Sequence, residues 1–266
     1  MTVASGPDLL ATIVAATERA VAVRARLTPV ERLDTTWRRP QGEAFERALR
    51  DGPAPRVIAE CKRRSPSRGI LRQDYDPAAH ARAYESAGAA AISVLTEPTF
   101  FDGHPSHLRA VRDAVRIPVL RKDFIVTSYQ LAEAAALGAD AVLLIVAALD
   151  DEALPALLGE AASFGLACLV EVHAGDEVRR AFDAGARIVG VNSRNLRTLG
   201  VDMHVLDDIA ARLPATVTAV AESGIRSRSD IDRLSALGYD AFLVGERLIT
   251  EADPGAALRR LREGER

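Results

Sequence analysis

Cysteine is scarce in this sequence of 266 residues, which contains only Cys61 and Cys168. Each lies inside a short apolar run typical of a β-strand, so a fold built around disulfides is not expected. The first ten residues also lack the basic and apolar regions of a secretory signal. From these absences we expect a cytoplasmic protein.

Long apolar runs and an excess of basic charge are missing as well. No stretch approaches the ~20 apolar residues that a membrane-spanning helix needs. The formal net charge is -3, which argues against a broad nucleic-acid-binding surface. The chain also has no Gly-x-Gly-x-x-Gly turn of the kind that marks a dinucleotide-binding sheet. We therefore expect neither nucleic acid nor a membrane as a partner.

What the chain does contain is a regular alternation of short apolar runs and longer helical patterns. Eight strand-like runs recur at intervals of roughly 20 to 35 residues, the spacing of successive βα units. Glycine separates several helical patterns from the next strand, as in the near-repeats at 136–141 and 236–241, where it suits a left-handed helix end. The predicted strands are 57–62, 90–95, 118–122, 141–146, 167–172, 188–192, 217–222 and 241–245.

This alternation predicts the fold class. Strict βα order implies a parallel sheet, and eight units favour closure into a barrel over an open doubly wound sheet. About fifty residues precede the first strand and carry helical patterns at 9–14 and 45–49. We predict a single α/β domain over residues 1–266, a (β/α)8 TIM barrel in which residues 1–50 form an N-terminal helical extension covering one end.

The first predicted strand ends in two opposite charges, Glu60 and Lys62. Side chains alternate along a strand, so these two share a face while Cys61 points the other way and packs. An unpaired buried charge is costly, so Glu60 and Lys62 should be paired or functional. The polar residues 65–69 that follow predict a loop.

Polar side chains also end other predicted strands. In a barrel all these ends converge on one face and surround one pocket. The residues expected there are Lys122, Glu171, Asn192, Arg194 and Glu222. Arg121 and Asp123, on either side of Lys122, are instead interpreted as solvated loop residues.

The last two strands carry signals for phosphate. Ser223 and Gly224 follow the seventh strand, and Gly245 ends the eighth, where barrels often hold a phosphate between neighbouring turns. Phe101 and Phe124 follow the second and third strands and fit either core packing or a slot for an aromatic substrate.

Two other patterns are given little weight. His104 and His107 have a spacing seen in metal sites, but a proline between them and the lack of a cysteine nearby argue against metal. The basic residues at 62–64, 68 and 72 lack interleaved aromatics, so local anion binding is favoured over nucleic acid.

With these residues placed, the chain resembles the indole-3-glycerol phosphate synthase family from about residue 9 to 262. The resemblance rests on five motifs at strand ends: residues 58–67, 120–126, 169–173, 190–196 and 221–225. It implies a barrel with a helical extension and neither cofactor nor metal. It also implies conversion of 1-(2-carboxyphenylamino)-1-deoxyribulose 5-phosphate into indole-3-glycerol phosphate, with loss of carbon dioxide and water, in tryptophan biosynthesis. The implied partner is this phosphosugar with its anthranilate ring, and association with other tryptophan-pathway enzymes is left open.

The resemblance also implies roles. Lys122 would protonate the ketone during ring closure, and Glu171 with Lys62 would act in dehydration. Glu60 would be a second base or hold Lys62, and which carboxylate takes the proton stays open. Asn192 and Glu222 would orient the lysines and the substrate hydroxyls. The implied phosphate positions are Ser65, Ser223, Gly224 and Gly245. The implied positions on the aromatic side are Arg194, Leu196, Phe101, Phe124 and Leu143.

Glu246 departs from the family members that have serine at this position. A carboxylate cannot donate to phosphate, so only the Glu246 backbone amide could bind there. Two alternatives remain. A phosphoribosylanthranilate isomerase would need a cysteine base in the lumen at the first strand, but Cys61 faces the wrong way. A non-catalytic phosphosugar-binding barrel would not need Lys122 and Glu171 together.

Overall fold

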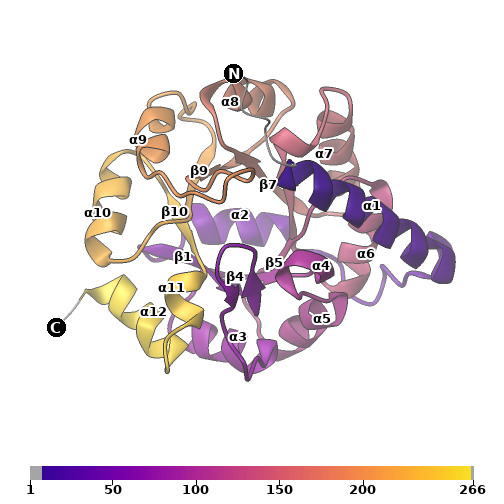
Figure 1. The fold of residues 1–266 in the computed structure, drawn as a ribbon, viewed down its shortest axis with the longest axis horizontal. Helices are drawn as coiled ribbons and strands as arrows, with labels where there is room; N and C mark the ends of the chain where they lie inside the picture. Colours follow the sequence, from indigo (N-terminus) through magenta and orange to yellow (C-terminus); the bar gives the residue numbers. More distant parts are fainter. Residues whose placement is uncertain (1–7, 265–266) are drawn as a thin grey trace, which may run out of the picture.

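The structure is a computed structural model that describes residues 8–264. Within these residues, eight parallel strands close into a barrel in which each strand pairs with the next barrel strand along the chain, and the last pairs with the first (Figure 1). The strands are β1 (Arg56–Cys61), β4 (Ala91–Leu95), β5 (Val119–Lys122), β6 (Ala141–Ile145), β7 (Ala167–Val172), β8 (Ile188–Asn192), β9 (Thr218–Glu222) and β10 (Ala241–Val244). The predicted (β/α)8 barrel is confirmed, and every predicted strand boundary lies within one residue of the observed one.

Helices follow the strands and surround the barrel (Figure 1). Several begin at an acidic cap followed by proline: Asp76 accepts from the Ala79 amide at the start of α3, and Asp253 accepts from the Ala256 amide at the start of α12. The outer helices are α3 (Pro77–Ser86), α4 (Pro98–Phe101), α5 (Pro105–Ala114), α6 (Ser128–Leu137), α7 (Ala153–Ser163), α8 (Gly175–Asp183), α9 (His204–Ala210), α10 (Arg228–Ala236), α11 (Glu246–Ile249) and α12 (Pro254–Glu263), with a short 3-10 turn η2 (Val146–Ala148). Gly138 and Gly238 follow α6 and α10 with φ of 89° and 100°, as the near-repeats predict.

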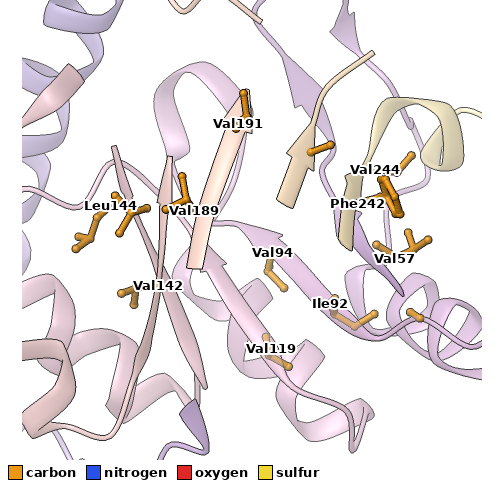
Figure 2. Close-up of a cluster of buried hydrophobic side chains, with 14 of the residues drawn as sticks. Val57, Ile92, Val94, Val119, Val142, Leu144, Val189, Val191, Phe242 and Val244 are labelled. Carbon is orange, nitrogen blue, oxygen red and sulfur yellow. The ribbon is translucent and has the colours of Figure 1, made fainter. Parts of the chain in front are cut away.

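The side chains of the strands form two apolar layers. One layer points outward to the helices, and Figure 2 shows part of it. Its labelled members are Val57, Ile92, Val94, Val119, Val142, Leu144, Val189, Val191, Phe242 and Val244. The alternate residues, such as Ile58, Leu143 and Leu243, fill the lumen. Because the lumen is packed in this way, open space for a ligand lies at the ends of the strands.

The N-terminal extension contains α1 (Leu9–Leu27), a 3-10 turn η1 (Val30–Arg32) and α2 (Gly42–Arg50). Phe45 and Leu49 of α2 are fully buried in the lumen cluster, with residues that begin the strands, so α2 closes the N-terminal end of the barrel. Helix α1 lies at the rim of the opposite end, near α6, and its residues Leu9 and Ile13 line the pocket described below (Figure 1). The predicted N-terminal helical extension is confirmed, but only α2 covers the N-terminal end of the barrel, and α1 packs at the other end.

The polar segment after β1 has regular secondary structure. It forms a small antiparallel hairpin, β2 (Arg64–Ser65) and β3 (Gly69–Ile70), in which Ser65 pairs with Gly69. Ser65 is buried, and residues 65–68 line the pocket. Within residues 8–264, no helix combines the length and apolar character needed to cross a membrane.

Candidate active site

A cavity of about 740 Å³ opens at the C-terminal ends of the barrel strands. Its wall contains every residue that the sequence placed at the site: Glu60, Lys62, Ser65, Phe101, Lys122, Phe124, Leu143, Glu171, Asn192, Arg194, Leu196, Glu222, Ser223, Gly224 and Gly245. Barrel closure thus brings together side chains separated by more than a hundred positions in the sequence.

Lys122, Glu171 and Glu222 form the ionic centre of this cavity. Lys122 Nζ donates to Glu171 Oε2 at 2.9 Å and to Glu222 Oε2 at 3.4 Å. Burial alone would lower the pKa of Lys122, but the two carboxylates raise that pKa well above its ordinary value. Burial alone would raise the pKa of Glu171, but Lys122, assisted by His173, holds it well below its ordinary value. The centre therefore offers an ammonium donor beside an ionised carboxylate.

Glu222 differs from Glu171 in its protonation. Burial raises the pKa of Glu222 to about 8, since the charge of Glu171 adds to the shift and Lys122 only partly opposes it. Its Oε1 has no hydrogen-bond partner within residues 8–264. This oxygen fills the space in front of Gly190 on β8, where a Cβ would lie 2.1 Å away. Sequence reasoning missed Gly190, although a glycine inside a strand is a signal of such a close approach.

Glu60 and Lys62 are paired, as predicted. Lys62 Nζ donates to Glu60 Oε1, and Glu60 is buried. The Glu60 carboxylate occupies the space in front of Gly245, where a Cβ would lie 2.3 Å from Oε1. Cys61 faces away from the pocket, packs in the outer layer and lies near the carbonyl of Pro77. Burial raises its pKa well above the ordinary value, so the thiol is not a base for the pocket.

Arg121 and Asp123 are not solvated loop residues, and that interpretation is wrong. Arg121 is completely buried and Asp123 nearly so. Arg121 Nη2 donates to Asp123 Oδ2 at 2.9 Å and to Glu133 Oε2 of α6 at 2.7 Å. Thr96 Oγ1 donates to the same Asp123 oxygen at 2.6 Å. These bonds fix both neighbours of Lys122 and so fix the end of β5 that carries it.

The turn after β9 has a backbone suited to an anion. Ser223 and Gly224 are both left-handed, with φ of 67° and 74°. This conformation costs a non-glycine residue about 1–2 kcal/mol, so its surroundings must hold Ser223 in place. Successive amides in such turns form concave anion sites. Ser65 and Gly245 line the same cavity.

Glu246, the departure from the family pattern, bridges two arginines. Its Oε1 lies 3.2 Å from Arg68 Nε, and its Oε2 lies 3.6 Å from Arg194 Nη2. Arg194 Nη1 also donates to Ser67 Oγ at 3.3 Å. The ion pairs join the β2–β3 hairpin and the loop after β8 to the start of α11. Binding of phosphate by the Glu246 amide stays a prediction.

Asn192 ends β8 at the cavity wall. Its Oδ1 accepts from the Arg194 backbone N–H at 2.9 Å, which shapes the turn after the strand. In residues 8–264 it makes no hydrogen bond to Lys62 or Lys122. Its predicted role toward the substrate hydroxyls stays a prediction.

The remaining wall of the cavity is apolar. Phe101 and Phe124 approach with ring centroids 6.1 Å apart, and Leu143 and Leu196 belong to the same cluster. Leu9 and Ile13 of α1 add to the wall and were not identified from the sequence. A planar aromatic group would be desolvated here.

The two histidines with metal-like spacing have structural contacts. His104 caps α5 by accepting from the Ser106 amide at 3.1 Å, and the His107 ring packs edge-on against Tyr75. In the part of the chain that the structure describes, no group of three or more His, Cys, Asp or Glu side chains could hold a metal ion.

The fold and the pocket define a (β/α)8-barrel enzyme with acid and base groups at the C-terminal ends of its strands. The family model described as indole-3-glycerol phosphate synthase matches residues 10–261. The chain therefore belongs to the indole-3-glycerol phosphate synthase family, a family of carboxy-lyases in tryptophan biosynthesis.

Curated relatives carry the same name. A protein of Streptomyces griseus subsp. griseus, "Indole-3-glycerol phosphate synthase", is 52% identical over 235 residues, which cover 88% of this chain and 87% of the relative. "Indole-3-glycerol phosphate synthase 1" of Streptomyces coelicolor is 56% identical over 211 residues, 79% of this chain and 78% of the relative.

Solved structures show the fold alone. A 3-hexulose-6-phosphate synthase aligns with a TM-score of 0.63 at 16% identity, over 78% of this chain and 98% of its own. A thiamine phosphate pyrophosphorylase from Pyrococcus furiosus aligns with a TM-score of 0.59 at 19% identity, over 77% of this chain and 93% of its own.

Proposed function

We propose that the pocket converts 1-(2-carboxyphenylamino)-1-deoxyribulose 5-phosphate into indole-3-glycerol phosphate, carbon dioxide and water. The observation that carries this proposal is the Lys122 ammonium, held by Glu171 and Glu222 in a cavity that also has an apolar wall. Ring closure needs a fixed proton donor beside a slot for an aromatic ring, and this arrangement supplies both.

Lys122 acts in the first step. The ring carbon that bears the carboxylate attacks the ketone carbon, and the ketone oxygen takes a proton from Lys122 Nζ as the new C–C bond forms. The carboxylate then leaves as carbon dioxide, and the electron pair of the broken bond restores the aromatic ring. Because its charge is balanced by two carboxylates, Lys122 is fixed in position before substrate binds.

The second step is dehydration. A base removes a proton from the carbon next to nitrogen, and an acid protonates the departing hydroxyl so that water leaves and the indole double bond forms. Glu171, whose lowered pKa keeps it ionised, is the proposed base, and Lys62 is the proposed acid. Glu60 is proposed to hold Lys62, a role supported by their direct contact.

The phosphate and the anthranilate ring of the substrate are proposed to bind in different parts of the cavity. The phosphate is proposed to bind at Ser65, Ser223, Gly224 and Gly245, where left-handed backbone and small residues allow close approach. The anthranilate ring is proposed to lie against Phe101, Phe124, Leu143, Leu196 and Arg194. Ile13 of α1 and Phe45 of α2 belong to the same apolar cluster as the lumen side chains of the strands, which supports treating residues 1–266 as one domain.

We further infer that the protein works in the cytoplasm, because Cys61 and Cys168 are both free thiols, which suits a reducing compartment. Association with other enzymes of tryptophan biosynthesis stays a prediction from the resemblance.

The test is to mix purified protein with the carboxyphenylamino substrate and to follow indole fluorescence and carbon dioxide release. We expect both signals to appear together without an added metal or cofactor. Phosphoribosylanthranilate is the matched control substrate, and we expect no isomerisation of it. Isomerisation without indole formation would replace this proposal with the isomerase, and binding without either reaction would replace it with a phosphosugar-binding barrel.

A further inference from the structure

His173 lies immediately behind Glu171. It directly follows Val172, the last residue of β7, and is two positions after Glu171 along the chain. Its Nε2 is 3.1 Å from Glu171 Oε1, the carboxylate oxygen that Lys122 does not contact. The side chain is 14% exposed and is absent from the cavity wall, so it reaches the site only through Glu171.

A second carboxylate supports the imidazole from the other side. Glu177, in the first turn of α8, places Oε2 3.6 Å from His173 Nδ1, and the same oxygen accepts from the His173 backbone N–H at 2.6 Å. The charged groups facing the imidazole are thus Glu171 from β7 and Glu177 from α8. Carboxyl side chains and basic side chains therefore alternate along a row of five residues: Glu177, His173, Glu171, Lys122 and Glu222.

Two carboxylates stabilise the charged form of the imidazole. Burial alone would lower the pKa of His173, but its contacts with Glu171 and Glu177 raise that pKa to about 9. At neutral pH the ring therefore carries a positive charge, and Glu171 lies between two cations that hold different oxygens.

We propose that His173, as an imidazolium, is a positioning residue for Glu171, holding Oε1 so that Oε2 is directed to Lys122 and the substrate. This inference rests on the proposed role of Glu171 as the base in dehydration. The ion pair with Oε1 opposes rotation of the carboxylate away from Lys122, and the added positive charge reduces its basicity so that it can release the proton after dehydration. Among the titratable groups around Glu171, Lys122 and Glu222 line the pocket, whereas His173 does not.

The first test needs no substrate. In protein labelled with 15N-histidine, with the His173 signal assigned by its loss in His173→Asn, we expect its imidazole to titrate near pH 9. The midpoint should fall in both Glu171→Gln and Glu177→Gln. His204, whose side chain is 87% exposed, is the reference in the same spectra. A His173 midpoint at or below 6.5 in wild type, or one unmoved by Glu171→Gln, overturns the pairing.

The second test measures the effect on the reaction. In His173→Asn, the acid limb of kcat/KM should move upward by about one pH unit, because Glu171 loses a stabilising cation, while KM changes less than about twofold. His173→Lys should restore the wild-type limb by returning the charge. Measuring the profiles again in a Glu222→Gln background removes the titration of Glu222 from the comparison. An equal loss of rate at every pH, with no rescue by lysine, would show a merely structural role.

The two tests also separate this inference from the proposed function. If wild type forms no indole-3-glycerol phosphate, the function is contradicted and the catalytic part of the inference falls with it. The histidine titration still decides whether His173 pairs with Glu171. If wild type is active but His173→Asn retains the wild-type pH profile, only the inference about His173 is overturned.

Discussion

Glu222 shows how strongly the barrel changes the chemistry of a single residue. It is almost completely buried, one of its oxygens has no partner within residues 8–264, and its other oxygen shares Lys122 with Glu171. Two carboxylates that share one ammonium do not ionise equally, because the charge of the first raises the pKa of the second. Glu171 is therefore the ionised carboxylate and Glu222 the protonated carboxyl group at neutral pH.

This assignment predicts a dependence of stability on pH. The pKa of Glu222 rises from 4.5 to about 8 on folding. Its stabilising contribution to the free energy of unfolding is therefore fully present below pH 4.5 and is lost as pH rises through 8. Relative to Glu222→Gln, wild type should lose at least about 1 kcal/mol of unfolding free energy between pH 5 and pH 8.5. Urea unfolding of both proteins at the two pH values measures the difference. A difference that stays constant with pH would contradict the raised pKa.

At the scale of elements, α2 closes one end of the barrel. Phe45 and Leu49 project from it into the lumen cluster, where they cover residues at the N-terminal ends of the strands. Gly42 lies against the backbone before β7, where an added Cβ would come within 2.6 Å of the Ala167 nitrogen. The helix is thus an integral part of the core and lies at the opposite end from the catalytic groups.

Phe45→Ala should therefore reduce stability much more than it reduces activity. Removing a fully buried phenylalanine costs about 3–5 kcal/mol through lost transfer energy and an unfilled cavity. Phe182→Ala is the matched control, because Phe182 lies on α8 with 45% of its surface exposed, and such a change costs less than about 0.5 kcal/mol. Urea unfolding measures both variants. Equal effects of the two substitutions would contradict the role of α2 as a closing element.

Elements were predictable from sequence where the signal is local. Strand boundaries follow from apolar runs between junctions such as Gly138 and Gly238, which are local features of the chain. The ends of the barrel at which α1 and α2 pack were not predictable, because an amphipathic pattern identifies the buried face of a helix but not the surface against which it packs. Arg121 was also misread, since its partner Glu133 lies twelve positions away on the next helix.

On the scale of the whole molecule, barrel closure explains why the site was easier to predict than its details. Side chains that point into the lumen at the C-terminal ends of the strands share one cavity, so barrel closure brings Lys122 and Glu171 together. Contacts that depend on three-dimensional packing were missed: Gly190 inside β8 signals a close approach but does not identify Glu222 as the neighbour, and the ion pair of His173 with Glu171 depends on the turn after β7. The ion pairs Arg24–Glu133 and Arg121–Glu133 extend this packing from α1 through α6 to β5.

The central claim is that Lys122 donates the proton for ring closure, and Lys122→Arg tests it most directly. Arginine keeps a positive charge for Glu171 and Glu222, but a guanidinium does not give up its proton in proteins. Single turnovers with substrate labelled in the ring carboxylate, followed by release of labelled carbon dioxide, measure this step alone. The account predicts substrate binding within about tenfold of wild type and a rate of release lower by about 10²–10⁴. Release within about tenfold of the wild-type rate would contradict it.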